Sequence, residues 1–310
     1  MSNFFPKLVV LSFRKLGTEI DLRIVVSEKK QEQVARRDLL EAEKIYEKYH
    51  LMFSRFEREN ELARLNAELG SFREAKPEIL EIAGKCLSYN KMTQGYFDPR
   101  IICFLENCGY DRDFESLDFS EKRYGGTSKI IKSLGEDLKI EGGRILLLER
   151  VDFSGIAKGW ITDRVADFLL GRGWKNFVVD SGGDMYFSGL NEKLEKWTVD
   201  IAGIPFEKLT LGFLNKAIAT SGIGKRKWEN GGGRFHHLIN PKDPEDFSFD
   251  LKSVTVIADS VEEADVWAKT LFLMGKEKGI VYARKNSIGS IFLDYKGNAG
   301  ISPAINGYKI

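Results

Sequence analysis

Hydrophobic and polar positions follow two periods along the chain, one typical of strands and one typical of helices. Apolar side chains alternate with polar ones over residues 20–26 and gather over 8–12, so both segments are predicted as strands. Over residues 28–50 the apolar positions recur every three to five residues among charged ones, which indicates an amphipathic helix. A further helix is predicted over 77–92, because a proline suits its first position and a glycine follows its end.

The centre and the C-terminal half combine short strands with two more helices. Helices are predicted over 157–170 and 261–274, and 108–143 is expected to be a long connection with short helical pieces. The predicted strands cover 145–148, 151–153, 177–180, 185–188, 197–202, 209–214, 234–239, 253–258 and 287–295. Because strands outnumber helices and many connections have hairpin length, the pattern predicts an α+β fold with largely antiparallel sheets and packed helices.

Composition narrows the class of protein. With 310 residues and 43% hydrophobic residues, we expect a single unit over 1–310, with two interlocked subdomains as the alternative. A formal net charge of +1 and the lack of a basic run argue against nucleic-acid binding. Since no window approaches eighteen uninterrupted apolar residues, we expect no membrane span. The first residues have no basic stretch followed by a long apolar one, so we expect a cytoplasmic protein.

The first chemical candidate is the segment 151–160, in which a strand is predicted to turn into a helix at Ser154 and Gly155. Free N–H groups at a helix start, with Lys158 expected in the first turn, favour a bound phosphate. An ordinary strand-to-helix turn with a solvated lysine is the alternative, because neither a Walker motif nor a GxGxxG motif is present.

Three other clusters carry acids, glycines or histidines. Residues 180–184 place two glycines after a strand, which fits either a close approach to a ligand or a tight hairpin turn. His236 and His237 are adjacent on a predicted strand and therefore point to opposite faces, so one of them at most enters a given site as a general base. Asp265, on the last long helix, fits either a Mg²⁺ ligand or an exposed acid paired with Lys269.

In order and spacing these clusters resemble the FAD:protein FMN transferase (ApbE) family. The family's D-x-G-G-I-A-K-G-Y segment is matched by 152–160, its N-x-G-G-D by 180–184 and its A-x-A-T-S-G by 217–222. Further matches are 16–18, 53–56, 61–66, 95–99, 162–163, 236–241, 253–258 and 264–270. The resemblance covers nearly the whole chain, and it implies a T-fold-like α+β architecture.

The resemblance also implies an activity, which is the transfer of FMN from FAD to a threonine hydroxyl of an acceptor protein, with Mg²⁺ present and AMP released. It implies that Lys158 and the N–H groups of 156–159 hold the pyrophosphate, that Asp163 meets the adenine, and that Asp265 and the Ala157 carbonyl ligate Mg²⁺. The resemblance implies that His237, as the candidate base, and Asp265 are the catalytic residues. It implies that FAD is bound by Tyr96, Phe97, Asp98, Gly155, Lys158, Gly159, Asp163, Gly183, Ser221 and His237.

Departures from the family pattern leave alternatives open. Lys269 stands where the family has a threonine, four residues after the metal-binding Asp265, and an ammonium cannot ligate a metal. Either Lys269 swings out and leaves a weaker metal site, or it substitutes for the metal. Two other functions therefore remain: hydrolysis of FAD at the same site, and flavin binding without catalysis in a homologue that has lost its metal.

Overall fold

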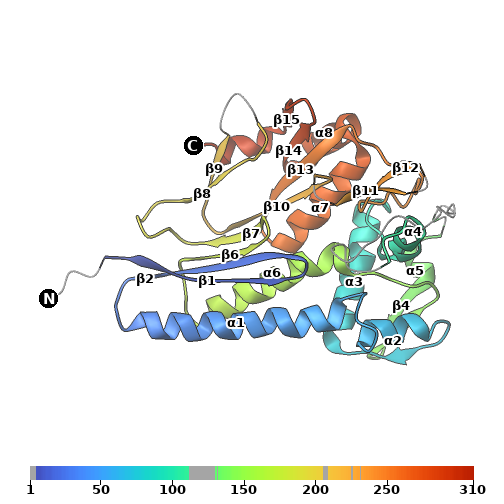
Figure 1. Cartoon of the computed structure of the whole chain (residues 1–310), viewed down its shortest axis with the longest axis horizontal. Helices are drawn as coiled ribbons and strands as arrows, with labels where there is room; N and C mark the ends of the chain where they lie inside the picture. Colours follow the sequence, from blue (N-terminus) through green and yellow to red (C-terminus); the bar gives the residue numbers. More distant parts are fainter. Residues whose placement is uncertain (1–4, 112–129, 131, 205–208, 225, 231) are drawn as a thin grey trace.

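A large antiparallel sheet forms the centre of the molecule, as seen in a computed structural model that describes residues 5–111, 130, 132–204, 209–224, 226–230 and 232–310 (Figure 1). The strand order is β1-β2-β6-β7-β10-β13-β14-β15, and each neighbouring pair is antiparallel. The strands are β1 (Lys7–Lys15), β2 (Thr18–Val26), β6 (Phe177–Ser181), β7 (Asp184–Ser188), β10 (Lys216–Gly222), β13 (Leu251–Ala258), β14 (Gly289–Asp294) and β15 (Ala299–Ile301). The predicted α+β class with a largely antiparallel sheet is confirmed.

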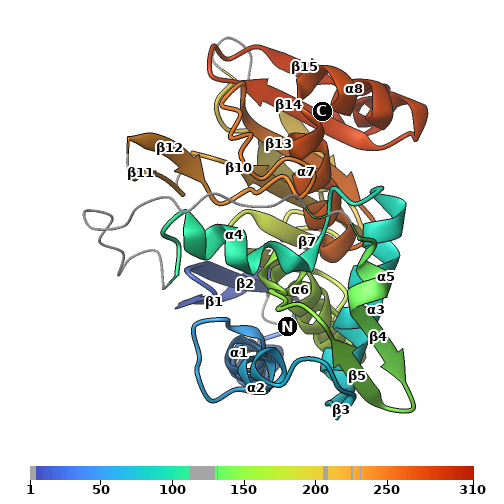
Figure 2. The same ribbon diagram turned by 90° about the vertical axis from the view of Figure 1, so that its right-hand side faces the viewer.

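Helices cover one face of this sheet, and a hairpin covers the other. The first face packs against α1 (Gln31–Phe53), α6 (Ser154–Gly171), α7 (Val261–Met274) and α8 (Lys276–Lys285). The other face carries the hairpin of β8 (Trp197–Asp200) and β9 (Thr210–Phe213) together with η3 (Pro303–Tyr308), around the buried side chains of Phe213 and Ile305. In Figure 2, α1 is seen nearly end-on, below β1 and β2.

Smaller elements surround one end of α6. They are α2 (Glu61–Ala67), β3 (Arg73–Glu74), α3 (Pro77–Met92), η1 (Pro99–Ile101), α4 (Ile102–Asn107), α5 (Leu134–Asp137), β4 (Leu138–Glu141), β5 (Arg144–Leu147), β11 (Lys227–Asn230) and β12 (Gly233–His236). The predicted long connection over 108–143 contains α5 and β4, and its residues 112–129 and 131 lie outside the described part of the chain. Within the described residues, no helix combines the length and the apolar composition needed to cross a bilayer.

The predicted strand over 151–153 is wrong, and the helix that follows starts three residues earlier than expected, at Ser154. Asp152 is the cause, because its carboxylate accepts hydrogen bonds from the Ser154 N–H (2.8 Å) and the Ser154 hydroxyl (2.9 Å). The same carboxylate lies 3.3 Å from Arg55, and both side chains are buried. These contacts hold 151–153 as a turn that leads directly into α6.

Candidate functional site

One face of α6 is built for close contact with α7. Gly155, Gly159 and Asp163 follow each other at intervals of four residues, so they share one side of the helix. A Cβ on Gly159 would lie 2.6 Å from the Glu262 Cα and 2.9 Å from the Val261 carbonyl oxygen, so only glycine permits this helix contact. Gly159 therefore has a packing role in the described structure, and its expected place beside FAD stays a prediction.

Asp163 holds the first turn of α7. Its two carboxylate oxygens accept the N–H groups of Val261 (2.8 Å) and Glu262 (2.9 Å), which satisfies two donors that a helix start leaves without partners. Burial raises the pKa of Asp163 to about 7, although the two N–H groups act in the opposite direction. Asp163 therefore has a helix-capping role in the described structure, and its expected contact with the adenine stays a prediction.

Two N–H groups of the expected phosphate cradle at the start of α6 already have partners within the turn. The N–H groups of Ile156 and Ala157 both donate to the Phe153 carbonyl, at 2.9 and 2.8 Å. The Ser154 N–H is taken by the carboxylate of Asp152, a negative charge where an anionic ligand was expected. Because the helix begins at Ser154, Lys158 lies beyond the first turn. The side-chain cations nearby are therefore better placed to bind an anion than the N–H groups of Ser154, Ile156 and Ala157.

Lys158 reaches from α6 to the sheet and pairs with Asp184 at the start of β7. Asp184 is 1% exposed, and its other oxygen accepts the Thr220 N–H at 3.1 Å. Burial lowers the pKa of Lys158, but the carboxylates of Asp184 and Asp265 outweigh burial and leave that pKa raised. Lys158 is therefore a charged, partly exposed ammonium with a fixed position. The sequence marked Asp184 only as the last residue of a turn motif.

Lys269 turns inward from α7 instead of swinging out. Its Nζ donates to the Gly155 carbonyl at 2.7 Å and to the Asp265 carboxylate at 3.0 Å. The side chains of Lys269 and Asp265 are 17% and 6% exposed, so this pair is largely shielded from water. One lysine thereby connects the Gly155 carbonyl in the first turn of α6 to the Asp265 carboxylate on α7.

The residues proposed as Mg²⁺ ligands do not fit that metal here. Mg²⁺ takes octahedral coordination by oxygen atoms, and the Asp265 oxygen expected to supply one of them is bonded to an ammonium group. Ala157, the other expected ligand, lies near the start of α6, where its carbonyl is part of the helix. No group of three or more acids, histidines or cysteines suited to a metal occurs among the described residues.

The two adjacent histidines have separate environments, as strand alternation predicts. His236 is 1% exposed and packs edge-on against Phe247, Phe249 and Phe272, while its Nε2 lies 3.1 Å from the Ser248 carbonyl. Burial lowers the pKa of His236 to about 4. This histidine belongs to an aromatic cluster.

His237 lies on the side of the charged groups, one residue beyond the end of β12. Its Nδ1 is 3.2 Å from the Arg226 carbonyl oxygen, which can only accept, so Nδ1 carries the proton and Nε2 has a free lone pair. Burial, followed by the charges of Arg226 and Lys269, lowers the pKa of His237 to about 3. A neutral imidazole therefore faces a cluster of cations.

Arg226 is the functional candidate that sequence reasoning missed. Its guanidinium lies 3.0 Å from the point that a Cβ on Gly17 would occupy, and its charge acts on both Lys158 and His237. The signal in the sequence was its position, four residues after the 217–222 motif. With Lys158 and Lys269 it forms a set of three cations, which we call the cation cluster.

The segment 96–98 meets the site through one of its three residues. The Phe97 ring lies 3.5 Å from the point that a Cβ on Gly155 would occupy, so it contacts the start of α6. Asp98 is buried and accepts hydrogen bonds from Arg100 through both oxygens, at 2.9 and 2.7 Å, so its described contacts form an internal ion pair. Tyr96 lies beneath the Lys242 ammonium, 4.5 Å from the ring centre.

Two other expected FAD-binding residues have only structural contacts in the described part of the chain. Gly183 adopts a φ of +97° and donates its N–H to Asp180 at 2.8 Å, as expected for a glycine in a tight hairpin turn. Ser221 is buried in β10 opposite Val254. Neither residue is tied to the cation cluster by a described contact.

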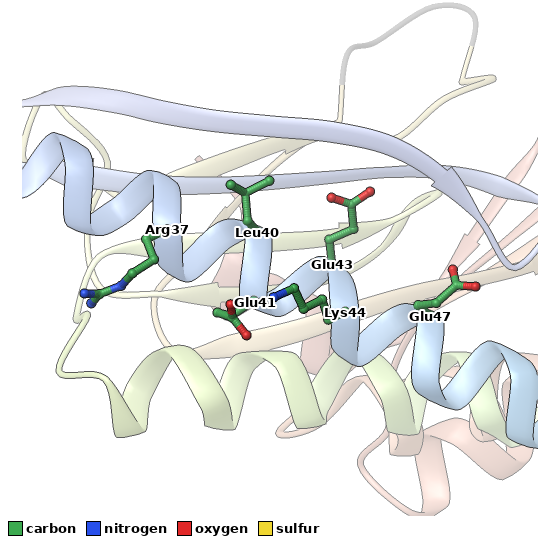
Figure 3. Close-up of a pocket in the computed structure, with 6 residues that line it drawn as sticks. All are labelled: Arg37, Leu40, Glu41, Glu43, Lys44 and Glu47. Carbon is green, nitrogen blue, oxygen red and sulfur yellow. Dashed lines mark hydrogen bonds and ion pairs between the residues drawn. The ribbon is translucent and has the colours of Figure 1, made fainter.

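Two surface hollows lie away from the cation cluster. Figure 3 shows the first, which is formed entirely by α1 residues, namely Arg37, Leu40, Glu41, Glu43, Lys44 and Glu47. The second lies beside β12 and is lined by Gly232, Gly233, Arg234, Phe235, Glu245, Phe247 and Phe249. Both lack the residues that resemble the family motifs, so the candidate site is defined by its charges.

Comparisons with known proteins agree with the motifs. A model described as the ApbE family matches residues 16–292. A FAD:protein FMN transferase of Vibrio cholerae is 28% identical over 290 residues, 90% of this chain and 85% of that protein. One from Haemophilus influenzae is 25% identical over 324 residues, 98% of this chain and 91% of that protein.

Solved structures share the fold. The flavin transferase ApbE from Vibrio cholerae superimposes with a TM-score of 0.78 at 23% identity, covering 98% of this chain and 99% of that one. The flavinyl transferase ApbE of Pseudomonas stutzeri gives 0.82 at 21% identity, covering 99% and 98%. The T-fold-like architecture expected from the motifs is therefore shared with this group of structures.

Proposed function

The chain belongs to the ApbE family, and we propose that it transfers FMN from FAD to a hydroxyl group of an acceptor protein. The observation that carries this proposal is the cation cluster of Lys158, Arg226 and Lys269 beside a neutral His237. FAD consists of FMN and AMP joined through a pyrophosphate, so a site for breaking it needs fixed positive charge and a proton acceptor.

The reaction exchanges one phosphorus–oxygen bond for another. The acceptor hydroxyl oxygen attacks the phosphorus on the FMN side, while the bond from that phosphorus to the bridging oxygen breaks. AMP leaves with the bridging oxygen, and the hydroxyl proton passes to a base. Charge develops on the phosphoryl oxygens during this step, and the cation cluster is arranged to stabilise it without reorganisation.

His237 is the proposed base, with Nε2 as the accepting atom. Its Nδ1 proton is held by the Arg226 carbonyl, which fixes the ring and leaves the Nε2 lone pair available. Burial and neighbouring cations lower the pKa of the free site, so the imidazole is neutral at pH 7. A bound pyrophosphate places negative charge beside the ring, which raises this pKa and makes Nε2 a better proton acceptor.

We further propose threonine as the accepting residue, in line with the family resemblance, and a cytoplasmic location for the reaction. The resemblance also implies Mg²⁺, but the hydrogen bond from the Lys269 ammonium to the Asp265 carboxylate does not fit a metal ion at that carboxylate. The proposed steps therefore use only groups of the chain itself.

A product assay tests the proposal. The protein is incubated with FAD and a peptide that carries one threonine, and AMP release and peptide mass are measured together. We expect equimolar AMP and FMN-modified peptide, and no modification of a matched peptide with valine in place of the threonine. AMP and free FMN with an unmodified threonine peptide would contradict transfer.

A further inference from the structure

The ammonium group of Lys269 is fixed in place by contacts that an exposed surface lysine lacks. Its Nζ contacts the Gly155 carbonyl and the Asp265 carboxylate, which belong to two different helices. An ammonium group has three N–H donors, and the described residues supply acceptors for two of them. A third donor is thus available to a ligand oxygen, at a point fixed by the other two contacts.

The charge of the site favours a divalent anion even without a metal. The cations Lys158, Arg226 and Lys269 outnumber the two carboxylates paired with them, Asp184 and Asp265, so these five groups together carry a net charge of +1. A divalent metal on the Asp265 oxygen would lie directly beside the ammonium group and be repelled by it. The pyrophosphate of FAD carries two negative charges, which such a cluster attracts.

We propose that Lys269 is a built-in cation for the FAD pyrophosphate and takes the place of a divalent metal. FAD binding by this chain accordingly requires no Mg²⁺. The inference rests on the proposed function in one respect, which is that FAD is the ligand.

FAD affinity is the first test, measured by titration with excess Mg²⁺ and with EDTA. For the wild type we expect dissociation constants within about twofold of each other. Lys269→Met should weaken FAD binding about 10- to 100-fold under both conditions, because it removes one charge-assisted contact. Lys269→Thr should bind weakly in EDTA and recover at least part of the loss with Mg²⁺.

Two further variants separate loss of charge from loss of fold. Lys44→Met is the matched control, because Lys44 also pairs with an acid of its own helix, Glu41 at 2.8 Å, but on the exposed face of α1 shown in Figure 3. It should leave FAD affinity unchanged. Lys269→Met combined with Asp265→Asn avoids an unpaired buried carboxylate, and this folded double variant should still bind FAD weakly.

Metal binding without FAD gives an independent readout. Mn²⁺ titration followed by electron paramagnetic resonance should show no stoichiometric site in the wild type and a new site in Lys269→Thr. Stoichiometric Mn²⁺ binding by the wild type, or FAD affinity that falls tenfold or more in EDTA, overturns the inference while leaving the proposed function standing. Failure to bind FAD under every condition overturns both.

Discussion

Replacing Lys158 by methionine should damage stability and FAD binding through two separable effects. Asp184 is 1% exposed, and one of its oxygens has the Lys158 ammonium as its described partner. Removing one member of a buried ion pair costs about 3–5 kcal/mol, and we expect roughly 2–4 kcal/mol here because the Lys158 side chain is 29% exposed. Loss of a charge-assisted contact to FAD should cost a further 1.5–3 kcal/mol of binding energy, or about 10- to 150-fold in affinity.

A double variant separates the two effects. Adding Asp184→Asn to Lys158→Met removes the uncompensated carboxylate and keeps an oxygen for the Thr220 N–H, so stability should return to within about 1 kcal/mol of wild type. FAD affinity should stay low, because the ammonium is still missing. Equilibrium unfolding in urea and FAD titration are measured on the wild type, both single variants and the double variant. Wild-type affinity in the double variant would refute a direct contact between Lys158 and FAD.

Three further outcomes follow from the structure. His237→Asn should lower the rate of AMP release about 10²-fold or more, while a larger loss from His236→Asn would show that the wrong histidine was assigned as base. Gly159→Ala should lower the free energy of unfolding by about 1–3 kcal/mol, because the added methyl group clashes with Glu262. The control Gly171→Ala, which adds a methyl group in open space, should leave the free energy of unfolding unchanged. Equal effects of the two variants would refute the packing role of Gly159. The folded-state pKa of His236 is about 4, below its ordinary 6.5, so the contribution of this histidine to stability is lost as the pH falls below 6.5. Between pH 7 and 4.5 the free energy of unfolding of the wild type, measured in urea, should therefore fall by roughly 2–3 kcal/mol more than that of His236→Gln. Equal losses in the two proteins would contradict this.

Strongly periodic or clearly bounded elements could be predicted from the sequence. The helix predicted over 261–274 has the bounds of α7, and the one over 77–92 has those of α3. The segment 151–153 was predicted wrongly, since its turn depends on the partners of the Asp152 carboxylate, which include Arg55, far away in the sequence, as well as the nearby Ser154. Local pattern alone presents Val-Asp-Phe as a strand.

The sequence predicted which segments contribute to the candidate site, but it predicted the contacts of the individual side chains less well. Spacing and resemblance selected Lys158, His237 and Asp265. In the structure the Asp265 carboxylate acts on Lys158, and the neutral His237 lies within the field of Arg226 and Lys269. Asp98 was assigned to FAD although an arginine follows two residues later, and Arg100 takes both of its oxygens. The fold determines which group an acidic side chain binds, and a sequence motif shows only that the acidic residue is present.

The interval of four residues between Gly155, Gly159 and Asp163 explains why packing and chemistry fall on the same nine residues, 155–163, of α6. Gly159 and Asp163 hold α6 against the first turn of α7, and the Gly155 carbonyl meets Lys269 farther along the same helix. Lys158 lies one position off this face and therefore reaches the sheet instead of α7. The separation of the two ammonium groups is thus set by the contact between the helices. A change that forces the helices apart should displace Lys269 from Lys158, so residues that pack the two helices together should also affect how well the FAD pyrophosphate is held.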